Sequence, residues 1–186
     1  AEHQTAGRGR MMREWESSEG KGIWMTIIIR PEIAPHQAPQ FTLVTAVAVV
    51  NAMKAMFKNF TPEIKWPNDI LVNGKKTTGI LTEMVAEADR IQALLIGIGI
   101  NVNQQMDDFP EPLQSIATSI AIEEGEPIER VHLVANVLDF LEHYSDMYVK
   151  NGFGFIKTLW EDSSGTIGKR VKATTLREVV EGEAIS

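Results

Sequence analysis

The spacing of apolar and polar positions divides the chain into a strand-rich first half and a helical second half. The first apolar run, residues 22–29, is short, rich in β-branched side chains and bounded by Gly22 and Pro31, which predicts a mostly buried strand. From Gln40 to Asn59, apolar residues recur every three or four positions, so this stretch predicts a helix with a long apolar face.

A meander of strands is expected after this helix. Residues 64–66 form a short predicted strand, and residues 70–84 read as a hairpin around Asn73-Gly74, a pair typical of a two-residue type I′ turn. A second turn at residues 88–90 leads into an apolar strand over residues 91–102.

Three helices are predicted in the second half. They cover residues 112–124, 128–150 and 153–160, and Asn151-Gly152 has the composition of a left-handed cap that ends the second one. Strands and helices therefore occur in separate runs, which favours the α+β class.

The last residues form a separate short unit. Ser163-Ser164-Gly165 resembles a linker, and residues 170–175 and 183–186 are predicted strands around a polar turn at Glu181-Gly182. About twenty residues cannot enclose a core of their own. We therefore assign residues 1–163 to one domain and expect residues 164–186 to begin a second, small β domain of a longer protein.

Composition excludes several classes of protein. With no cysteine, these residues hold no disulfide, no cysteine zinc site and no thiol nucleophile, which is compatible with a cytoplasmic protein. No apolar run reaches the length of a membrane span, and the first residues do not resemble a signal peptide.

The charge of the chain is unevenly distributed. The 18 Lys and Arg and 25 Asp and Glu give a net charge of −7, but residues 1–80 hold 10 basic and 7 acidic side chains, a local charge of +3. A surface that coats DNA should be basic overall, so the balance argues against nucleic-acid coating. It leaves room for a local anion site in the first half.

Two clusters in the first half could form such a site. Gly7-Arg8-Gly9-Arg10, followed by Trp15, combines glycines that allow close backbone approach with forked donors suited to carboxylate or phosphate. Lys65-Trp66-Pro67-Asn68-Asp69 places a lysine, an amide and a carboxylate around a turn, as needed for a polyanion with a divalent metal. A solvated surface loop and an ordinary strand connection are the respective alternatives.

Two further clusters are weaker when taken alone. Lysines in Lys75-Lys76-Thr77-Thr78-Gly79 follow the predicted hairpin turn, where such side chains are usually solvated. Gly97 and Gly99, which precede Asn101, alternate along a strand, so a ligand could lie on that face, or the glycines could serve backbone packing. A dinucleotide site is excluded, because the run lacks a third glycine and no helix begins directly after it.

Together the clusters resemble the biotin protein ligases of bacteria, over about residues 1–160. The order and spacing of several groups of residues carry this resemblance: Gln4, Ala6-Gly7-Arg8-Gly9-Arg10, Trp15, Lys65-Trp66-Pro67-Asn68-Asp69, Lys76, Gly79-Ile80-Leu81, Glu83 and Gly97-Ile98-Gly99-Ile100-Asn101. The resemblance implies the biotin/lipoate protein ligase catalytic fold, a mixed or antiparallel sheet with helices packed on one side. It also implies that residues 166–186 begin a small SH3-like β-barrel domain.

The family makes biotinyl-5′-adenylate from biotin and ATP and then passes biotin to a lysine of the carboxyl carrier domain of acetyl-CoA carboxylase. By resemblance, Lys76, Arg8 and Arg10 are the catalytic residues. Asp69 is the expected residue near Mg²⁺, and residues 104–112 correspond to a loop that orders over the adenylate. The remaining biotin and nucleotide contacts fall on Gln4, Gly7, Gly9, Trp15, Lys65, Trp66, Asn68, Gly79, Gly97, Gly99 and Asn101.

The chain departs from the family pattern in two places, and other functions remain open. Members often carry glycine where this chain has Met12, so the loop is expected to be less bent, and the Ser-Thr pair that holds the biotin ring is absent. A lipoate ligase of related fold and a non-catalytic biotin-sensing regulator are alternatives, whereas an octanoyl transferase would need a cysteine. Some members carry an extra N-terminal helix-turn-helix domain, which residues 1–186 do not encode, and repress biotin genes as adenylate-bound dimers. The resemblance therefore leaves a homodimer open, and it leaves repression and DNA binding open for a full protein that has this domain.

Overall fold

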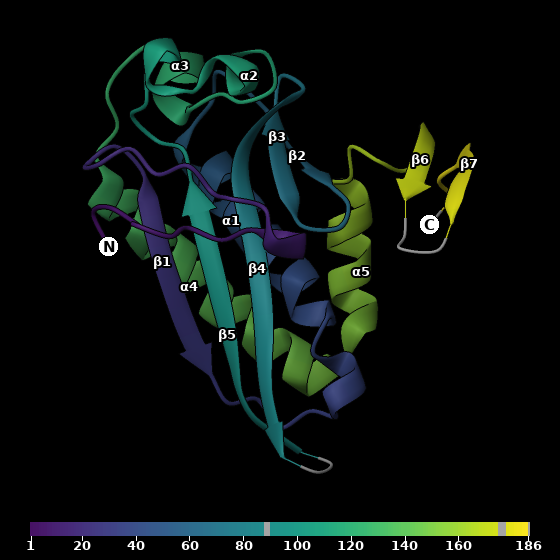
Figure 1. Cartoon of the computed structure of the whole chain (residues 1–186). Coiled ribbons are helices and arrows are strands. Elements are labelled where there is room, and N and C mark those ends of the chain that lie inside the picture. Colours follow the sequence, from purple (N-terminus) through teal and green to yellow (C-terminus); the bar gives the residue numbers. More distant parts are fainter. Residues whose placement is uncertain (88–89, 175–177, 186) are drawn as a thin grey trace.

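An antiparallel five-stranded sheet is the centre of the computed structural model, which describes residues 1–87, 90–174 and 178–185 (Figure 1). The strand order is β1-β5-β4-β3-β2, and every neighbouring pair is antiparallel. The strands are β1 (Ile23–Ile29), β2 (Pro62–Lys65), β3 (Asp69–Val72), β4 (Lys75–Glu87) and β5 (Arg90–Ile100). The predicted meander is confirmed, and β1 forms one edge of the sheet by pairing with β5. Residues 88–89 of the predicted second turn lie outside the described residues.

Three long helices cover one face of the sheet, as predicted (Figure 1). They are α1 (Gln40–Met56), α4 (Arg130–Asn151) and α5 (Phe153–Asp162). The short helices α2 (Glu111–Gln114) and α3 (Ile120–Glu124) lie at one end of the sheet. Single 3-10 turns are η1 (Arg10–Met12), η2 (Pro35–Gln37) and η3 (Met106–Asp108). None of the described helices has the length and apolar character needed to cross a membrane.

The single helix predicted over residues 112–124 is wrong. Residues between α2 and α3 pair instead with the start of β4: Lys76 N–H donates to the Ile116 carbonyl at 2.8 Å, and Thr118 N–H donates to the Lys76 carbonyl at 3.0 Å. Ser119 then begins α3 by accepting a hydrogen bond from Ile122 N–H. The cap predicted after residue 150 also differs, because Gly152 has a positive φ of 77° but an extended ψ of −174°.

The two faces of the sheet have different neighbours. Along β5, Leu94, Ile96, Ile98 and Ile100 are at most 2% exposed and belong to the core beneath the helices. Strand side chains alternate between faces, so Leu95, Gly97 and Gly99 lie on the opposite face. The N-terminal segment crosses that face in front of β4 and β5 (Figure 1).

Helix α1 is buried on nearly all sides, rather than along one face as its sequence pattern predicts. Every residue from Val44 to Val50 is fully buried, because the helix lies between the sheet and the outer helices α4 and α5. Its mostly apolar sequence suits this position, and its buried Thr45 hydroxyl donates to the Phe41 carbonyl at 2.7 Å.

The two tyrosines of the chain should titrate abnormally. Tyr144 and Tyr148 are buried on α4, and burial raises the pKa of both phenols above the ordinary value of about 10. Because the folded pKa is raised, their contribution to stability is present below pH about 10 and is lost as the pH rises through the folded values. Phenolate absorbance, measured against pH in wild type, Tyr144→Phe and Tyr148→Phe, should show that each tyrosine ionises at a higher pH in the folded than in the unfolded protein. Ionisation at the same pH in both states would contradict the burial of the phenols.

The C-terminal residues form a hairpin anchored to the main sheet. Ile64 N–H donates to the Ser163 carbonyl at 2.8 Å and Gly165 N–H donates to the Ile64 carbonyl at 2.9 Å, so the expected linker extends the edge of β2. The hairpin pairs β6 (Arg170–Thr174) with β7 (Val179–Glu183). The predicted turn at residues 181–182 is therefore wrong, because both residues belong to β7; Thr175 and Ser186 lie outside the described residues.

Candidate active site

The N-terminal arginine cluster folds back on itself. Trp15 N–H donates to the Gly7 carbonyl at 3.0 Å, and Gly9 N–H donates to the Arg13 carbonyl at 2.7 Å. Between them, Met11 and Met12 have φ values of 55° and 60°, a left-handed conformation that favours glycine. The loop thus makes a tight bend without glycine at position 12.

Trp15 lies on a pair of glycines in the sheet. Gly79 and Gly99 are directly paired across β4 and β5. A Cβ atom would lie 2.5 Å from Trp15 Cζ3 if placed on Gly79, and 2.6 Å from Trp15 Cε2 if placed on Gly99. Trp24 contacts the same indole edge-on, with ring centroids 6.0 Å apart. The glycine-rich strand could serve ligand contact or packing. At Gly99 the structure favours packing, because the missing side chain makes space for the Trp15 indole.

Lys76 is held between this indole and a carboxylate. Its Nζ lies 2.7 Å from Asp69 Oδ1 and 5.2 Å from the centroid of the Trp15 ring. The Lys76 side chain is 35% exposed and that of Asp69 23%. Hairpin register brings them together, since Asp69 begins β3 and Lys76 lies near the start of β4. The lysine is thus partly shielded from water rather than freely solvated, and its ammonium is available to an incoming anion.

Asn68 fixes the turn between β2 and β3 and links it to the arginine loop. Its Nδ2 donates to the Ile80 carbonyl at 2.8 Å, Ile80 N–H donates back to the Asn68 carbonyl at 2.9 Å, and its Oδ1 accepts from Arg10 at 3.2 Å. The Trp66–Pro67 peptide bond in this turn is cis. Two segments 58 residues apart in sequence therefore meet here.

A cavity of about 500 Å³ lies between the N-terminal segment and the sheet. Five basic residues line it against three acidic ones, which favours an anionic ligand. Among the described residues, no group of three or more His, Cys, Asp or Glu side chains could hold a metal ion. The predicted site residues that line this cavity are Gln4, Arg8, Gly9, Arg10, Trp15, Lys65, Trp66, Asn68, Asp69, Lys76, Gly79, Gly97 and Gly99.

A second cavity of about 130 Å³ shares Trp15 and Lys76 with the first. Asn101 lines this smaller cavity, where its Nδ2 donates to the Thr118 carbonyl at 3.1 Å. Gly7 lines neither cavity, and a side chain there would meet the Trp15 carbonyl, so the structure gives it a packing role.

The sequence motifs missed part of both cavities. Met25, Thr26 and Leu95 line the larger one. Leu95 could have been predicted to line the cavity, because it lies two residues before Gly97 and side chains two apart in a strand lie on the same face.

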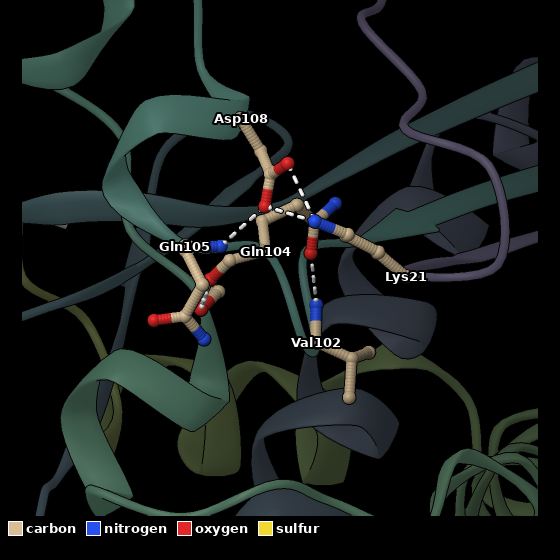
Figure 2. Close-up of polar contacts among 6 residues, drawn as sticks. Lys21, Val102, Gln104, Gln105 and Asp108 are labelled. Carbon is tan, nitrogen blue, oxygen red and sulfur yellow. Dashed lines mark hydrogen bonds and ion pairs between the residues drawn. The ribbon is translucent and has the colours of Figure 1, made fainter.

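Around the smaller cavity, the motifs missed a charged contact. Lys21 Nζ lies 2.5 and 2.6 Å from the two Asp108 carboxylate oxygens (Figure 2). The Lys21 hydrogen bond, followed by one from Gln105 N–H, holds the pKa of Asp108 below its usual range. Nothing in the spacing of the sequence connects these two residues, which are 87 positions apart.

Known proteins with similar sequences include ligases. Residues 1–101 match the profile of the Biotin/lipoate A/B protein ligase family. The chain is 52% identical over all 186 residues to the bifunctional ligase/repressor BirA of Bacillus spizizenii, and 33% identical over 180 residues to the biotin–[acetyl-CoA-carboxylase] ligase of Paracoccus denitrificans. It spans 57% of the length of the first protein and 73% of the second.

The fold is also found in a solved ligase. The biotin protein ligase of Aquifex aeolicus in complex with biotin and ATP superimposes with a TM-score of 0.85 and 28% sequence identity, over 98% of this chain and 74% of that one. This agreement confirms the predicted α+β ligase fold.

Proposed function

Because the chain belongs to the Biotin/lipoate A/B protein ligase family, we propose that it is the catalytic core of an ATP-dependent biotin–protein ligase. The enzyme would convert biotin and ATP to biotinyl-5′-adenylate and pyrophosphate, then transfer biotin to one lysine of the biotin carboxyl carrier domain of acetyl-CoA carboxylase. The observation that carries this proposal is the basic cavity, lined by nearly all the residues that the family pattern selects. Biotin rather than lipoate is the proposed substrate, because the Paracoccus denitrificans relative and the Aquifex aeolicus structure are both named as biotin ligases.

The first step brings two anions together. A carboxylate oxygen of biotin bonds to the α-phosphorus of ATP while the bond to pyrophosphate breaks. Lys76 offsets the repulsion between the reactants and stabilises charge that develops in the transition state. Asp69 and Trp15 hold its ammonium at the border of the two cavities, which would place biotin on one side and the nucleotide on the other.

Arg8 and Arg10 would hold the ligand from the opposite side. Both line the large cavity from the N-terminal segment, so their guanidinium groups can pair with carboxylate or phosphate oxygens. In the second step the carrier lysine attacks the acyl carbon, the bond to the phosphate oxygen breaks, and AMP leaves as the amine loses a proton. The step needs no protein nucleophile, consistent with a chain without cysteine.

The residues of the site suit a Mg²⁺ ion that is bound mainly by the phosphates of ATP, rather than one held by the protein alone. Mg²⁺ usually keeps several waters and binds through one or two carboxylates plus substrate phosphates. Asp69 is a suitable carboxylate in the turn that also holds Asn68, although Lys76 already occupies one of its oxygens. Mg²⁺ would neutralise part of the triphosphate charge, and Asp69 would supply one ligand.

Two further features of the whole protein are proposals. Residues 164–186 would begin a small C-terminal β domain, since the β6–β7 hairpin leaves Val179 and Val180 more than half exposed. The name of the Bacillus spizizenii relative includes a repressor activity for that protein; any DNA binding behind such an activity would lie outside residues 1–186, whose net charge is −7.

A transfer assay separates the biotin ligase from a lipoate ligase. Full-length protein with biotin, ATP, Mg²⁺ and a carrier domain should add one biotinyl group to one carrier lysine, as read by mass spectrometry, and a carrier with that lysine changed to Arg should remain unmodified. An excess of lipoate should neither be transferred nor inhibit. Transfer of lipoate instead of biotin would overturn the assignment.

A further inference from the structure

Buried hydrogen bonds fix the base of the loop that follows β5. Gln104 is 2% exposed; its Oε1 accepts from Val102 N–H at 2.7 Å (Figure 2), and its carbonyl accepts from the Ser119 hydroxyl at 2.7 Å. Asn103 is bound twice to Ile128, with Nδ2 donating to the carbonyl at 2.9 Å and Oδ1 accepting from the N–H at 2.8 Å. The base, residues 102–104, is therefore rigidly placed.

The tip of the loop, residues 105–109, is fastened by Lys21. The ammonium contacts both oxygens of Asp108, while Gln105 N–H donates to Asp108 Oδ2 at 2.7 Å within the tip itself (Figure 2). The Lys21 carbonyl also accepts from Asn103 N–H at 2.8 Å. Lys21, which lies two positions before β1, thus contacts both the base and the tip of the loop.

The fastened tip forms part of the smaller cavity. Asp108 and the 6% exposed Phe109 line it together with Trp15 and Lys76. Lys21 itself lines neither cavity. Its side chain can affect a bound ligand through Asp108, by fixing the tip and by neutralising a carboxylate that would otherwise face an anion.

We propose that Lys21 is a positioning residue that holds residues 105–109 against the smaller cavity and thereby sets the affinity for ATP. This inference rests on the proposed function, which brings the nucleotide to Trp15 and Lys76. Lys21 touches no reacting atom, so its loss should weaken nucleotide binding while leaving the chemical step intact.

The test is titration of full-length protein with a non-hydrolysable ATP analogue and Mg²⁺, together with steady-state kinetics of pyrophosphate release. Lys21→Met should raise the Kd of the analogue and the KM for ATP about fivefold, the size expected of a partly exposed ion pair, with kcat unchanged within twofold. Lys21→Arg should restore both values. Lys150→Met, which removes an exposed ion pair with Asp146 remote from both cavities, is the matched control and should change neither.

Hydrogen exchange supplies a second readout, because amides of residues 105–109 should exchange faster in Lys21→Met than in wild type. An unchanged Kd, or a fall in kcat without a change in KM, would overturn the role of Lys21. Wild type that binds the analogue but releases no pyrophosphate would refute the proposed function and leave the Kd comparison to decide on Lys21. Wild type that fails to bind the analogue would overturn both.

Discussion

Replacing Lys76 with methionine should slow formation of biotinyl-5′-adenylate about 10²–10³-fold, the loss typical of a removed charge-stabilising group in an active site. Methionine keeps an apolar stem beside Trp15 but removes the ammonium that lies 2.7 Å from Asp69 and 5.2 Å from the indole centroid. The variant also leaves Asp69 uncompensated where phosphates would bind. Stopped-flow measurement of adenylate formation under single-turnover conditions gives the rate, and thermal unfolding should shift by only a few degrees.

Two variants make the Lys76 result specific. Lys75→Met removes the preceding lysine, which lines neither cavity, and should leave the rate unchanged within twofold. Lys76→Met combined with Asp69→Asn should recover part of the loss if repulsion from Asp69 contributes. A Lys76→Met enzyme as fast as wild type would remove Lys76 from the catalytic assignment.

A single methyl group on Gly99 should damage both cavities at once. In Gly99→Ala the new Cβ would lie 2.6 Å from Trp15 Cε2, so the indole must move away from the sheet. Overpacking of this kind costs about 1–3 kcal/mol of the free energy of unfolding. Because Trp15 lines both cavities, we also expect a 10–100-fold loss of kcat/KM, of the order that a small misplacement of binding groups produces. Denaturant unfolding and pyrophosphate release measure the two effects.

The space around another glycine provides the control for Gly99→Ala. A Cβ at Gly154, which lines neither cavity, would have no atom within 4 Å, so alanine there should keep Trp15 in place and change neither measurement. Trp15→Phe in the Gly99→Ala background should be less harmful than the sum of the two single changes, because the smaller ring relieves the contact. Additive losses would show that Gly99 and Trp15 do not interact as the structure places them.

Local patterns predicted most elements of the fold because their causes are local. Asn73-Gly74 specifies the hairpin between β3 and β4, and Gly22 and Pro31 bound β1. The predictions fail where contacts with segments distant in sequence determine the structure. Residues 116–118 pair with β4 rather than continuing a helix, and α1 is buried on nearly all sides because two outer helices cover it.

Most candidate site residues could be selected because they occur in contiguous motifs, and the fold brings those motifs to one cavity. What a motif residue contacts was less predictable. Gly99 looked equally suited to ligand contact and to packing, and only the position of Trp15 decides between them. The contact of Lys21 with Asp108 depends on two loops that meet at one end of the sheet, and no spacing in the sequence encodes it.

We propose that the two cavities around Lys76 and Trp15 together bind biotin and ATP and join them. The most direct test of this proposal is pyrophosphate release by full-length protein with ATP and Mg²⁺, with and without biotin, with mass spectrometry of the small-molecule product. We expect pyrophosphate release that depends on biotin, and one product with the mass of biotinyl-5′-adenylate. Folded full-length protein that releases no pyrophosphate when biotin is added, or that forms an adenylate with lipoate but none with biotin, would contradict it.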